Sequence, residues 1–323
     1  MRPEWRQAIE SRYAVRGEYG PRSRVSAAMN SFLSEHVDRQ SFEAEYMRWV
    51  ACTAYLPCAW DRPSYRHWYT GHYVPLYGAC LRAELLRVAP AGGRDTLRVL
   101  DVGVGAGTTA LTLIDLLNTV EQLKLGPDLS IELTCLDWDS RKIRIAKDNI
   151  EAFSAYLEPG IAARMTNGGE PHWVQRNVAH TNVADLSGAS YDLIVLGNVV
   201  WELSQHSPAA RQNLVNLVSD ALSEGGTVLV LEPGQGNARG DEAAAAVCNF
   251  KRDLLGQGIG PELPCKNHCA TPKRGCPCGH DLDIVWPDFY IEWTDEENRR
   301  NPHVRWIGAA LKKPEPNLPL LVF

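Results

Sequence analysis

A cluster of cysteines in the last quarter of the sequence has the composition of a metal site. Four cysteines fall within 14 residues of the stretch PCKNHCATPKRGCPCGH, namely Cys265, Cys269, Cys276 and Cys278. Thiolates bind zinc with tetrahedral geometry and also bind iron-sulfur clusters, and spacing alone does not separate the two. Free thiols on a loop are the alternative, although a stretch rich in glycine and proline offers little apolar core to bury them. The segment 260–282 is therefore predicted to bind metal.

A second chemical feature is the glycine-rich segment VLDVGVGAGTTAL. It places Asp101, Gly103, Gly105 and Gly107 where a buried strand turns into a helix, and only glycine lets a ligand approach the backbone of such a turn closely. The spacing D-x-G-x-G-x-G differs from the dinucleotide pattern G-x-G-x-x-G, and the sequence lacks the phosphate-binding G-x-x-x-x-G-K-[ST]. The segment is therefore predicted to bind a nucleoside-bearing ligand.

An acidic residue follows one strand-helix unit later, in the stretch CLDWDS. Asp137 ends the second strand, where a carboxylate can accept hydrogen bonds from both hydroxyls of a ribose. Trp138 comes next and is a candidate to lie against an adenine ring, with packing in the core as the alternative. Asp139 is better explained as the N-cap of the following helix.

The elements that position these residues alternate between strand and helix from about residue 97. We expect strands at 97–103, 131–137, 172–178, 191–198 and 226–234, with helices at 108–123 and 140–157 and another that starts at Ser207 and Pro208. Such alternation specifies a mostly parallel sheet with helices on both faces. Two later segments, 288–296 and 303–313, are candidates to close the edge of the sheet.

The first 92 residues show helical periodicity and no long β-branched run. We therefore expect two parts, a helical N-terminal region over 1–92 and an α/β domain over 93–323 that carries the cysteine-rich segment. The pI near 5.9 and net charge of −6 give no global basic field for nucleic acid, although a local patch is compatible with them. The sequence contains no apolar run of membrane-spanning length and begins without a signal-peptide core, which predicts a cytoplasmic protein without membrane contacts.

From Val99 to about Leu231 the sequence resembles the class I S-adenosylmethionine-dependent methyltransferases. The resemblance implies a Rossmann-like fold with a seven-stranded, mostly parallel sheet. It also implies that Asp101 and the three glycines contact the methionine and ribose portions of S-adenosylmethionine, that Asp137 binds the ribose, and that Asn177 lies near the adenine. A turn residue at a strand end is the alternative for Asn177.

The segment YDLIVLGNVVWEL resembles the fourth motif of the same family, whose loop faces the transferred methyl group. The resemblance makes Asn198, Trp201 and Glu202 candidates to line the acceptor pocket and to serve catalysis. Packing under the loop is the alternative for Trp201, and a solvated helix start for Glu202. A protein that binds NAD is the competing interpretation of the whole α/β region.

Beyond the glycine loop, the sequence is similar to the methyltransferase-like proteins of the mitochondrial small ribosomal subunit. The similarity rests on a strand that ends in Glu232, Pro233 and Gly234 and on the aromatic segment YLPCAWDRPSYRHWY. It also rests on a helix that carries Arg252, Leu254 and Leu255, followed by Pro264 and Cys265 with further cysteines. It implies a 4Fe-4S cluster on four cysteines and association with small-subunit rRNA. In that family one cysteine ligand lies much further downstream, whereas no cysteine follows Cys278 here.

Three functions are therefore expected as alternatives. The first is an enzyme that methylates rRNA or an assembly factor of the small ribosomal subunit, with Lys273, Arg274, Arg299 and Arg300 as phosphate contacts and Trp286, Tyr290 and Trp293 as stacking platforms. The second is a methyltransferase for a small molecule or peptide, in which the N-terminal helices form a lid over an aromatic pocket. Its candidate lining residues are Trp60, Tyr65, His67, Trp68, Tyr69, His72 and Tyr73. The third is an inactive scaffold that binds S-adenosylmethionine.

Overall fold

The computed structural model describes most of the 323-residue chain. The described residues are 3–17, 20–23, 25–51, 62–88, 96–125, 129–165, 170–186, 188, 190–233, 238–261, 280–285 and 303–315.

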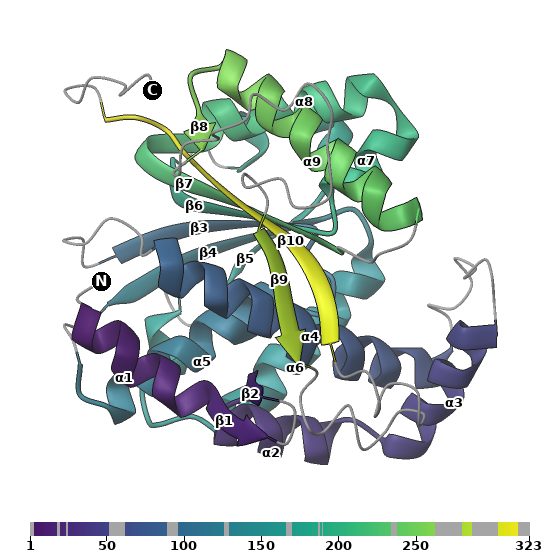
Figure 1. The fold of residues 1–323 in the computed structure, drawn as a ribbon, viewed down its shortest axis with the longest axis vertical. Coiled ribbons are helices and arrows are strands. Elements are labelled where there is room, and N and C mark those ends of the chain that lie inside the picture. Colours follow the sequence, from purple (N-terminus) through teal and green to yellow (C-terminus); the bar gives the residue numbers. More distant parts are fainter. Residues whose placement is uncertain are drawn as a thin grey trace.

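Five parallel strands form the centre of the molecule (Figure 1). They are β3 (Thr96–Val102), β4 (Ser130–Asp137), β5 (His172–Gln175), β6 (Tyr191–Gly197) and β7 (Leu222–Pro233). Their order across the sheet is β5-β4-β3-β6-β7, so the chain moves outward from β3 in one direction and returns to start again at β6. This is the order of a doubly wound, Rossmann-like sheet, and ligands of such sheets bind at the carboxyl ends of the strands where the order reverses.

The far side of β7 is closed by antiparallel strands. The strand β10 (His303–Lys312) pairs with β7 from Trp306 to Lys312. On its other edge it pairs with β9 (His280–Val285) near its start and with β8 (Gly260–Pro261) near its end. The expectation of seven strands was therefore wrong, because the described residues form eight: two short strands share one edge of β10.

Helices cover both faces of the sheet, as Figure 1 shows. One face carries α4 (Pro63–Val88), α5 (Thr108–Gln122) and α6 (Ser140–Ser154), and the opposite face carries α7 (Val200–His206), α8 (Pro208–Ala221) and α9 (Ala238–Gly256). Successive residues of β6 show the consequence: Leu193 and Val195 pack into the first core, and Ile194 and Leu196 into the second. Because side chains alternate across a strand, a strand buried on both faces is almost continuously apolar.

Short 3-10 helices complete the connections around β5. They are η2 (Ala162–Arg164), η3 (Val178–His180) and η4 (Val183–Leu186). Of these, η3 packs against α8. Among the described residues, no helix combines the length and apolar character that crossing a bilayer requires.

The N-terminal region contains α1 (Pro3–Tyr13), α2 (Ala27–His36), α3 (Arg39–Ala51) and α4. Besides these helices, β1 (Ala14–Gly17) and β2 (Gly20–Ser23) form an antiparallel pair that was not predicted from the sequence, and in which Gly17 lies opposite Gly20. Glycine and proline explain this local departure. They destabilise a helix, and Gly17, Gly20 and Pro21 all fall within this stretch.

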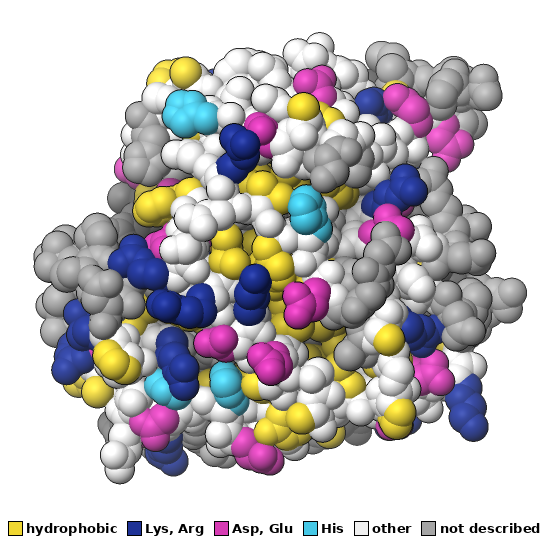
Figure 2. Space-filling view, turned by 180° about the vertical axis from the view of Figure 1, so that it is seen from behind, with side chains coloured by type: hydrophobic (Ala, Val, Ile, Leu, Met, Phe, Trp, Pro, Cys, Tyr) yellow, Lys and Arg dark blue, Asp and Glu magenta, His cyan; other side chains and the backbone are white. Residues whose placement is uncertain are grey.

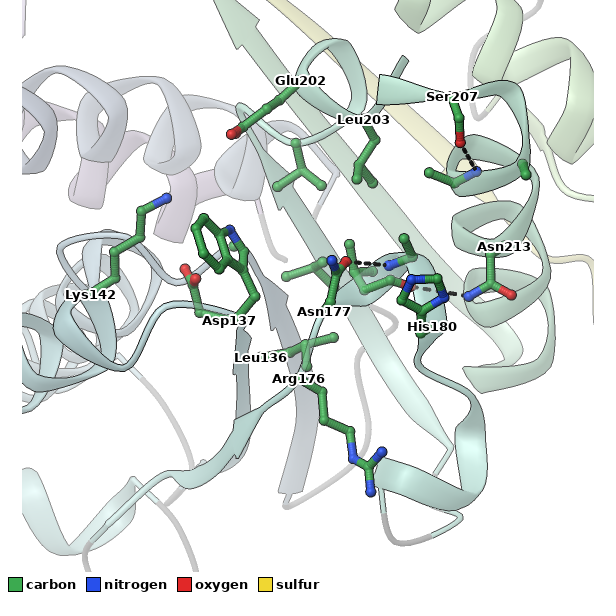
Figure 3. Close-up of a pocket in the computed structure, with 18 residues that line it drawn as sticks. Leu136, Asp137, Lys142, Arg176, Asn177, His180, Glu202, Leu203, Ser207 and Asn213 are labelled. Atoms are coloured by element: carbon green, nitrogen blue, oxygen red, sulfur yellow. Dashed lines mark hydrogen bonds between the residues drawn. The ribbon is translucent and has the colours of Figure 1, made fainter. Parts of the chain in front are cut away.

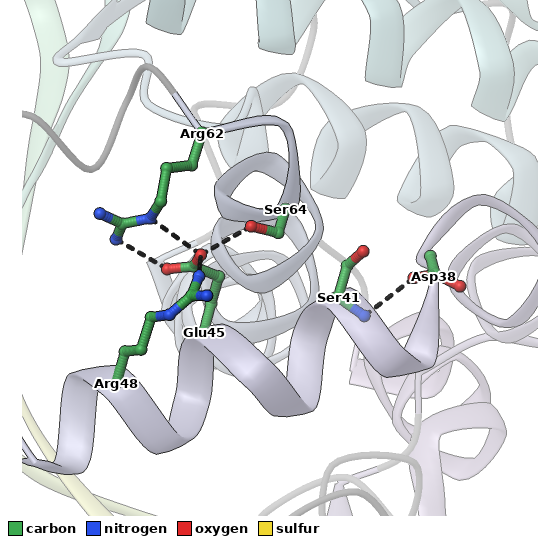
Figure 4. A network of polar contacts seen from close by, with 6 residues as sticks. All are labelled: Asp38, Ser41, Glu45, Arg48, Arg62 and Ser64. Carbon is green, nitrogen blue, oxygen red and sulfur yellow. Dashed lines mark hydrogen bonds and ion pairs between the residues drawn. The ribbon is translucent and has the colours of Figure 1, made fainter.

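A buried carboxylate joins α3 to the start of α4 (Figure 4). Glu45 is 0% exposed and accepts hydrogen bonds from Arg62 Nε and Nη2 at 2.9 and 2.8 Å and from Ser64 Oγ at 2.6 Å. Arg48 also pairs with this carboxylate. Because the partners come from both α3 and the beginning of α4, the network fixes where α4 starts.

Candidate functional site

The glycine loop follows β3 and has the backbone that its sequence predicts. Gly103 and Gly105 have φ values of +79° and +56°, in the left-handed region that other residues rarely adopt. A Cβ atom on Gly103 would lie 2.5 Å from Val199 Cγ2, so this position also lacks room for any side chain. Gly107, with φ of +79°, is the N-cap of α5. The three glycines therefore allow a sharp turn and close packing at the carboxyl end of β3.

Asp101 lies beneath this loop and is buried. Its Oδ1 accepts a hydrogen bond from Thr109 Oγ1 at 2.8 Å, whereas its Oδ2 has no hydrogen-bond partner among the described residues. Burial raises the pKa of this carboxyl to about 7, and the neighbouring charge of Asp137 acts in the same direction. In the described part of the chain, Asp101 Oδ2 therefore lacks a hydrogen-bond donor or a positive charge to compensate for its burial.

Asp137 ends β4, next to β3, and reaches the same loop. Its Oδ2 accepts from the backbone N–H of Gly105 at 3.3 Å and its Oδ1 accepts from that of Asp139 at 3.0 Å. Burial raises the pKa of Asp137, and Lys142 opposes that shift. Since each carboxylate oxygen has two lone pairs, both oxygens keep acceptor capacity for a ligand.

The two residues after Asp137 differ in role. Trp138 is 57% exposed, which excludes the alternative of core packing. Asp139 is the N-cap of α6, as expected, and accepts from the N–H of Arg141 at 2.9 Å. Ser207 caps α8 in the same way, with Pro208 in its first turn, which confirms that prediction too.

A cavity of about 660 Å³ opens at this edge of the sheet (Figure 3). Gly103, Asp137 and Trp138 line it together with Asn177 and Glu202. Figure 3 shows Lys142 of α6 at one end of the cavity and Asn213 of α8 at the other. Figure 2 shows that the face turned away from Figure 1 has a hydrophobic hollow bordered by charged side chains of both signs.

Asn177 lines this cavity and also shapes the backbone beside it. Its Oδ1 accepts from the N–H of Ala179 at 2.9 Å and caps η3. Asn177 therefore acts as a turn residue and also lines the cavity.

A second cavity of about 510 Å³ adjoins the first, and Gly103, Trp138, Lys142, Val199 and Glu202 line both. Its roof is formed by four tyrosines spaced four residues apart on α4, Tyr65, Tyr69, Tyr73 and Tyr77. Such spacing places side chains along one face of a helix. The tyrosines expected to line an aromatic pocket do so, and Tyr77 joins them.

The other aromatic residues of that expected set lie elsewhere. Trp68 is buried in the core, and His72 stacks on it with ring centroids 5.1 Å apart. His67 borders a separate small cavity and accepts from the N–H of Asp38 at 3.0 Å. Neither His67, Trp68 nor His72 lines the second cavity, and Trp60 lies outside the described residues. The spacing along α4 explains the difference. The tyrosines lie on the helix face toward the glycine loop, whereas Trp68 and His72 lie on the face toward the core.

Of the three residues expected at the acceptor pocket, Asn198 and Glu202 line at least one of the two cavities and Trp201 does not. Asn198 lines the second cavity, has φ of +57°, and leaves its buried Oδ1 without a partner among the described residues. Glu202 is exposed and lines both cavities. Trp201 lines neither of these two cavities and packs against the core of α7 to α9, in agreement with the packing alternative.

One buried carboxylate next to the site, outside the lining of both cavities, was not predicted. Glu232, near the end of β7, is 0% exposed, and its Oε1 accepts from the N–H groups of Val200 at 2.8 Å and Trp201 at 3.3 Å. Its Oε2 has no partner among the described residues, and burial raises its pKa to about 8. The sequence signal was a glutamate within an otherwise apolar buried strand, which requires a partner for the carboxylate.

The four cysteines lie outside the described residues, as do Trp286, Tyr290 and Trp293 and the basic residues Lys273, Arg274, Arg299 and Arg300. Within the part of the chain that the structure describes, no group of three or more His, Cys, Asp or Glu side chains is arranged to hold a metal ion. The metal prediction therefore still depends on the spacing of the cysteines.

Comparison with known proteins finds similarity only among solved structures. No family model and no curated protein sequence matches the chain. A TehB-like S-adenosylmethionine-dependent methyltransferase from Corynebacterium glutamicum is 17% identical, with a TM-score of 0.43 over 78% of this chain and 100% of its own. The N-methyltransferase NodS from Bradyrhizobium japonicum, in complex with S-adenosylhomocysteine, is 13% identical, with a TM-score of 0.43 over 80% and 95% of the two chains. At these values the likeness assigns no activity or substrate to this chain.

Proposed function

We propose that this chain is a class I methyltransferase that uses S-adenosylmethionine. The observation that carries the proposal is that Asp137, at the end of β4, and the glycine loop, at the end of β3, border one cavity where the strand order reverses. A nucleoside with a short, flexible side chain fits this arrangement, with its ribose at Asp137 and its amino-acid portion over the loop.

The charges of the site favour a cation over a dinucleotide. A dinucleotide would bring its pyrophosphate, with two negative charges, to the N-terminus of α5, beside the unpartnered carboxylate oxygen of Asp101. S-adenosylmethionine carries a sulfonium and an ammonium group instead, and a positive charge over the loop would be favoured by the carboxylate of Asp101 beneath it, although Asp101 itself lines neither cavity. The sixth position of the sheet also holds the antiparallel β10, whereas dinucleotide-binding sheets of this order continue with a parallel strand.

Methyl transfer requires little covalent chemistry from the protein. The acceptor attacks the methyl carbon in line with the breaking carbon-sulfur bond, so catalysis comes mainly from alignment and exclusion of water. The glycine loop and Asp137 would hold the donor, and the tyrosine face of α4 would cover the adjoining cavity where an acceptor approaches.

Calorimetry tests the proposal directly. We expect S-adenosylmethionine and S-adenosylhomocysteine to bind at one site per chain, NADH to give no heat, and Asp137→Ala to weaken binding by at least about tenfold. A protein that bound NADH and neither adenosyl ligand would refute the proposal. Binding without turnover on any acceptor would support the inactive scaffold.

We also propose rRNA of the small ribosomal subunit as the acceptor or binding partner, on a separate observation. The first two turns of α6 carry Arg141, Lys142, Arg144 and Lys147 directly after the exposed Trp138. Arg144 and Lys147 are exposed, and such residues beside an aromatic side chain suit a single-stranded nucleic acid. The test is binding of small-subunit rRNA at several salt concentrations, with Arg144→Gln and Lys147→Gln expected to weaken binding and to reduce its salt dependence.

The cysteine segment is proposed to hold a metal through Cys265, Cys269, Cys276 and Cys278, where it would stabilise a loop that otherwise lacks a core. Anaerobic purification followed by metal analysis and visible absorbance distinguishes the two candidates. Iron with broad absorbance supports a 4Fe-4S cluster, zinc with a featureless spectrum supports a zinc site, and absence of both rejects the proposal.

A further inference from the structure

One carbonyl group of the glycine loop is held from behind by a buried side chain of α6. Asn149 is 2% exposed, and its Nδ2 donates a hydrogen bond to the carbonyl oxygen of Ala106 at 2.9 Å. Ala106 lies between Gly105 and Gly107 and lines the second cavity, whereas Asn149 lines neither cavity. The carbonyl oxygen of Ala106 therefore points away from the cavity, toward α6.

The peptide group between Ala106 and Gly107 is fixed at both of its ends. Its N–H group, on Gly107, donates to the carbonyl oxygen of Val104 at 2.9 Å and closes a turn. Its carbonyl group is the one that Asn149 holds. The glycines on both sides of Ala106 have positive φ, and glycine backbone of this kind can turn a peptide group over unless hydrogen bonds prevent it. The two hydrogen bonds therefore determine which side of this peptide faces the cavity.

Further hydrogen bonds fix the orientation of the Asn149 amide. Its Nδ2 also donates to Thr70 Oγ1 of α4 at 3.0 Å, and its Oδ1 lies 3.1 Å from His36 Nε2 of α2, which can donate to it. The Thr70 hydroxyl and the His36 ring can each donate or accept, whereas the carbonyl oxygen of Ala106 only accepts. The NH₂ group must therefore face the loop, and one side chain links the loop to α2, α4 and α6.

Helix α6 and the loop also fit closely in shape. A Cβ atom on Gly107 would lie 3.1 Å from Ala146 Cβ, so the two backbones approach each other at this point. Ala146 and Asn149 lie on one face of α6, since residues three apart on a helix are neighbours. This face combines a small residue where the backbones approach with a donor where the loop presents a carbonyl oxygen.

The orientation of the Ala106–Gly107 peptide bears on the charges of the ligand. In the proposed function the amino-acid portion of the methyl donor lies over this loop, and that portion carries a carboxylate as well as an ammonium group. If the peptide turned over, its carbonyl oxygen would move from the α6 side of the loop to the side of the cavity. A carbonyl oxygen there would repel the ligand carboxylate, because both carry negative charge.

We propose that Asn149 is a positioning residue of the donor site. It holds the Ala106–Gly107 peptide with its carbonyl oxygen toward α6, and so keeps that oxygen away from the carboxylate of S-adenosylmethionine. Asn149 acts through the loop and does not touch the ligand, since it lines neither cavity. This inference rests on the proposed function.

NMR can observe this peptide in the ligand-free protein. The sequence contains two alanine-glycine peptides, Ala91–Gly92 and Ala106–Gly107, so ¹³C on alanine carbonyls and ¹⁵N on glycine nitrogens together select two signals. Ala91→Ser removes one of them and thereby identifies the other. We expect Asn149→Ala to shift the loop signal and to accelerate hydrogen exchange of the Gly107 N–H group by at least about tenfold.

Thr70→Val is the matched control. It keeps the shape of the side chain, removes the hydrogen bond from Asn149 to α4, and leaves the hydrogen bond to the loop in place. The loop signal and the exchange of Gly107 should therefore stay as in the unchanged protein, although the melting temperature should fall in both variants.

Calorimetry with S-adenosylhomocysteine tests the role of Asn149 in the site. Asn149→Ala should weaken binding by at least about tenfold, whereas Thr70→Val should bind as the unchanged protein does. Asn149→Asp keeps the shape of the side chain and places an acceptor oxygen near the carbonyl of Ala106, so it should weaken binding at least as much.

The outcomes distinguish this inference from the proposed function. No binding of S-adenosylhomocysteine by the unchanged protein would refute the proposed function and, with it, the role of Asn149 in a donor site. Binding that neither Asn149 variant weakens, a loop signal that does not move in Asn149→Ala, or equal weakening by Thr70→Val would overturn the inference alone.

Discussion

The hydroxyl of Tyr69 lies 2.8 Å from the position that a Cβ atom on Gly105 would occupy. Helix α4 therefore packs directly on the glycine loop, and the two elements must be considered together. Gly105→Ala would place a methyl group against that hydroxyl at a residue whose φ is +56°. We expect the affinity for S-adenosylhomocysteine, measured by calorimetry, to fall by more than about tenfold.

Two further variants separate the contact with Tyr69 from backbone strain. Gly258 has φ of +79° and nothing within 4 Å of its added Cβ, so Gly258→Ala should cost about 1–2 kcal/mol of stability and leave affinity unchanged. Tyr69→Phe removes the oxygen that a methyl group on Gly105 would meet. The double variant should therefore regain part of the lost affinity, and strictly additive losses would contradict this explanation.

The pH dependence of stability should report the buried carboxyl groups. Burial raises the pKa of Asp101 to about 7 and that of Glu232 to about 8, above their unfolded values of 3.8 and 4.5. The folded state thus holds more protons than the unfolded state in this range, and its stability is lost as pH rises through the folded values. The melting temperature of the ligand-free protein should fall between about pH 6.5 and 8.

The pH range above starts where it does in order to exclude the lower pH values, at which His72 has the opposite effect on stability. Burial lowers the pKa of His72 to about 3, so its contribution is lost as pH falls below its unfolded value of 6.5. The double variant Asp101→Asn, Glu232→Gln should have a flatter melting profile above pH 6.5. An unchanged slope in this variant would show that these two groups do not set the pH dependence.

Local patterns in the sequence were sufficient to predict the frame of the site. The strand β3, the glycine turn and α5 are specified within one continuous stretch, since apolar residues, glycine spacing and helical periodicity act over a few residues. The caps Asp139 and Ser207 were predictable for the same reason, because each bonds to an N–H two or three residues later.

Contacts between distant segments were not predictable in this way. Glu232 holds the start of α7 from a position about 30 residues later in the chain, and that bond exists only once β6 and β7 are paired. Likewise, which face of α4 meets the glycine loop depends on packing against α3 and α5, so Tyr69 and Trp68 were not distinguished. The sharing of one edge of β10 by β8 and β9 is also decided by tertiary structure.

The buried Glu45 should be one of the main contributors to the stability of the N-terminal helices. Glu45→Ala removes the common partner of Arg48, Arg62 and Ser64 (Figure 4). Both arginines are partly exposed and can turn to water, so we expect a loss of about 3 kcal/mol, at the lower end for a broken buried pair. Urea unfolding of the variant and of the unchanged protein measures this loss in the free energy of unfolding.

A matched control lies half a turn away on the same helix. Glu43 forms an exposed pair with Arg39 at 2.8 Å, and Glu43→Ala should cost less than about 0.5 kcal/mol. Similar losses for the two variants would mean that burial of Glu45 does not determine its contribution.

Trp138 should contribute to ligand binding without contributing to stability. Its side chain is 57% exposed and lies at the boundary of the two cavities, so Trp138→Ala removes little buried surface. If the indole stacks on the adenine of the methyl donor, the variant should lose about three- to tenfold in affinity for S-adenosylhomocysteine at an unchanged melting temperature. Leu255, 55% exposed on α9, provides the control, and Leu255→Ala should change neither quantity. An unchanged affinity in Trp138→Ala together with weakened rRNA binding would instead assign the indole to an unpaired base, because a solvent-facing aromatic beside the basic residues of α6 suits either partner.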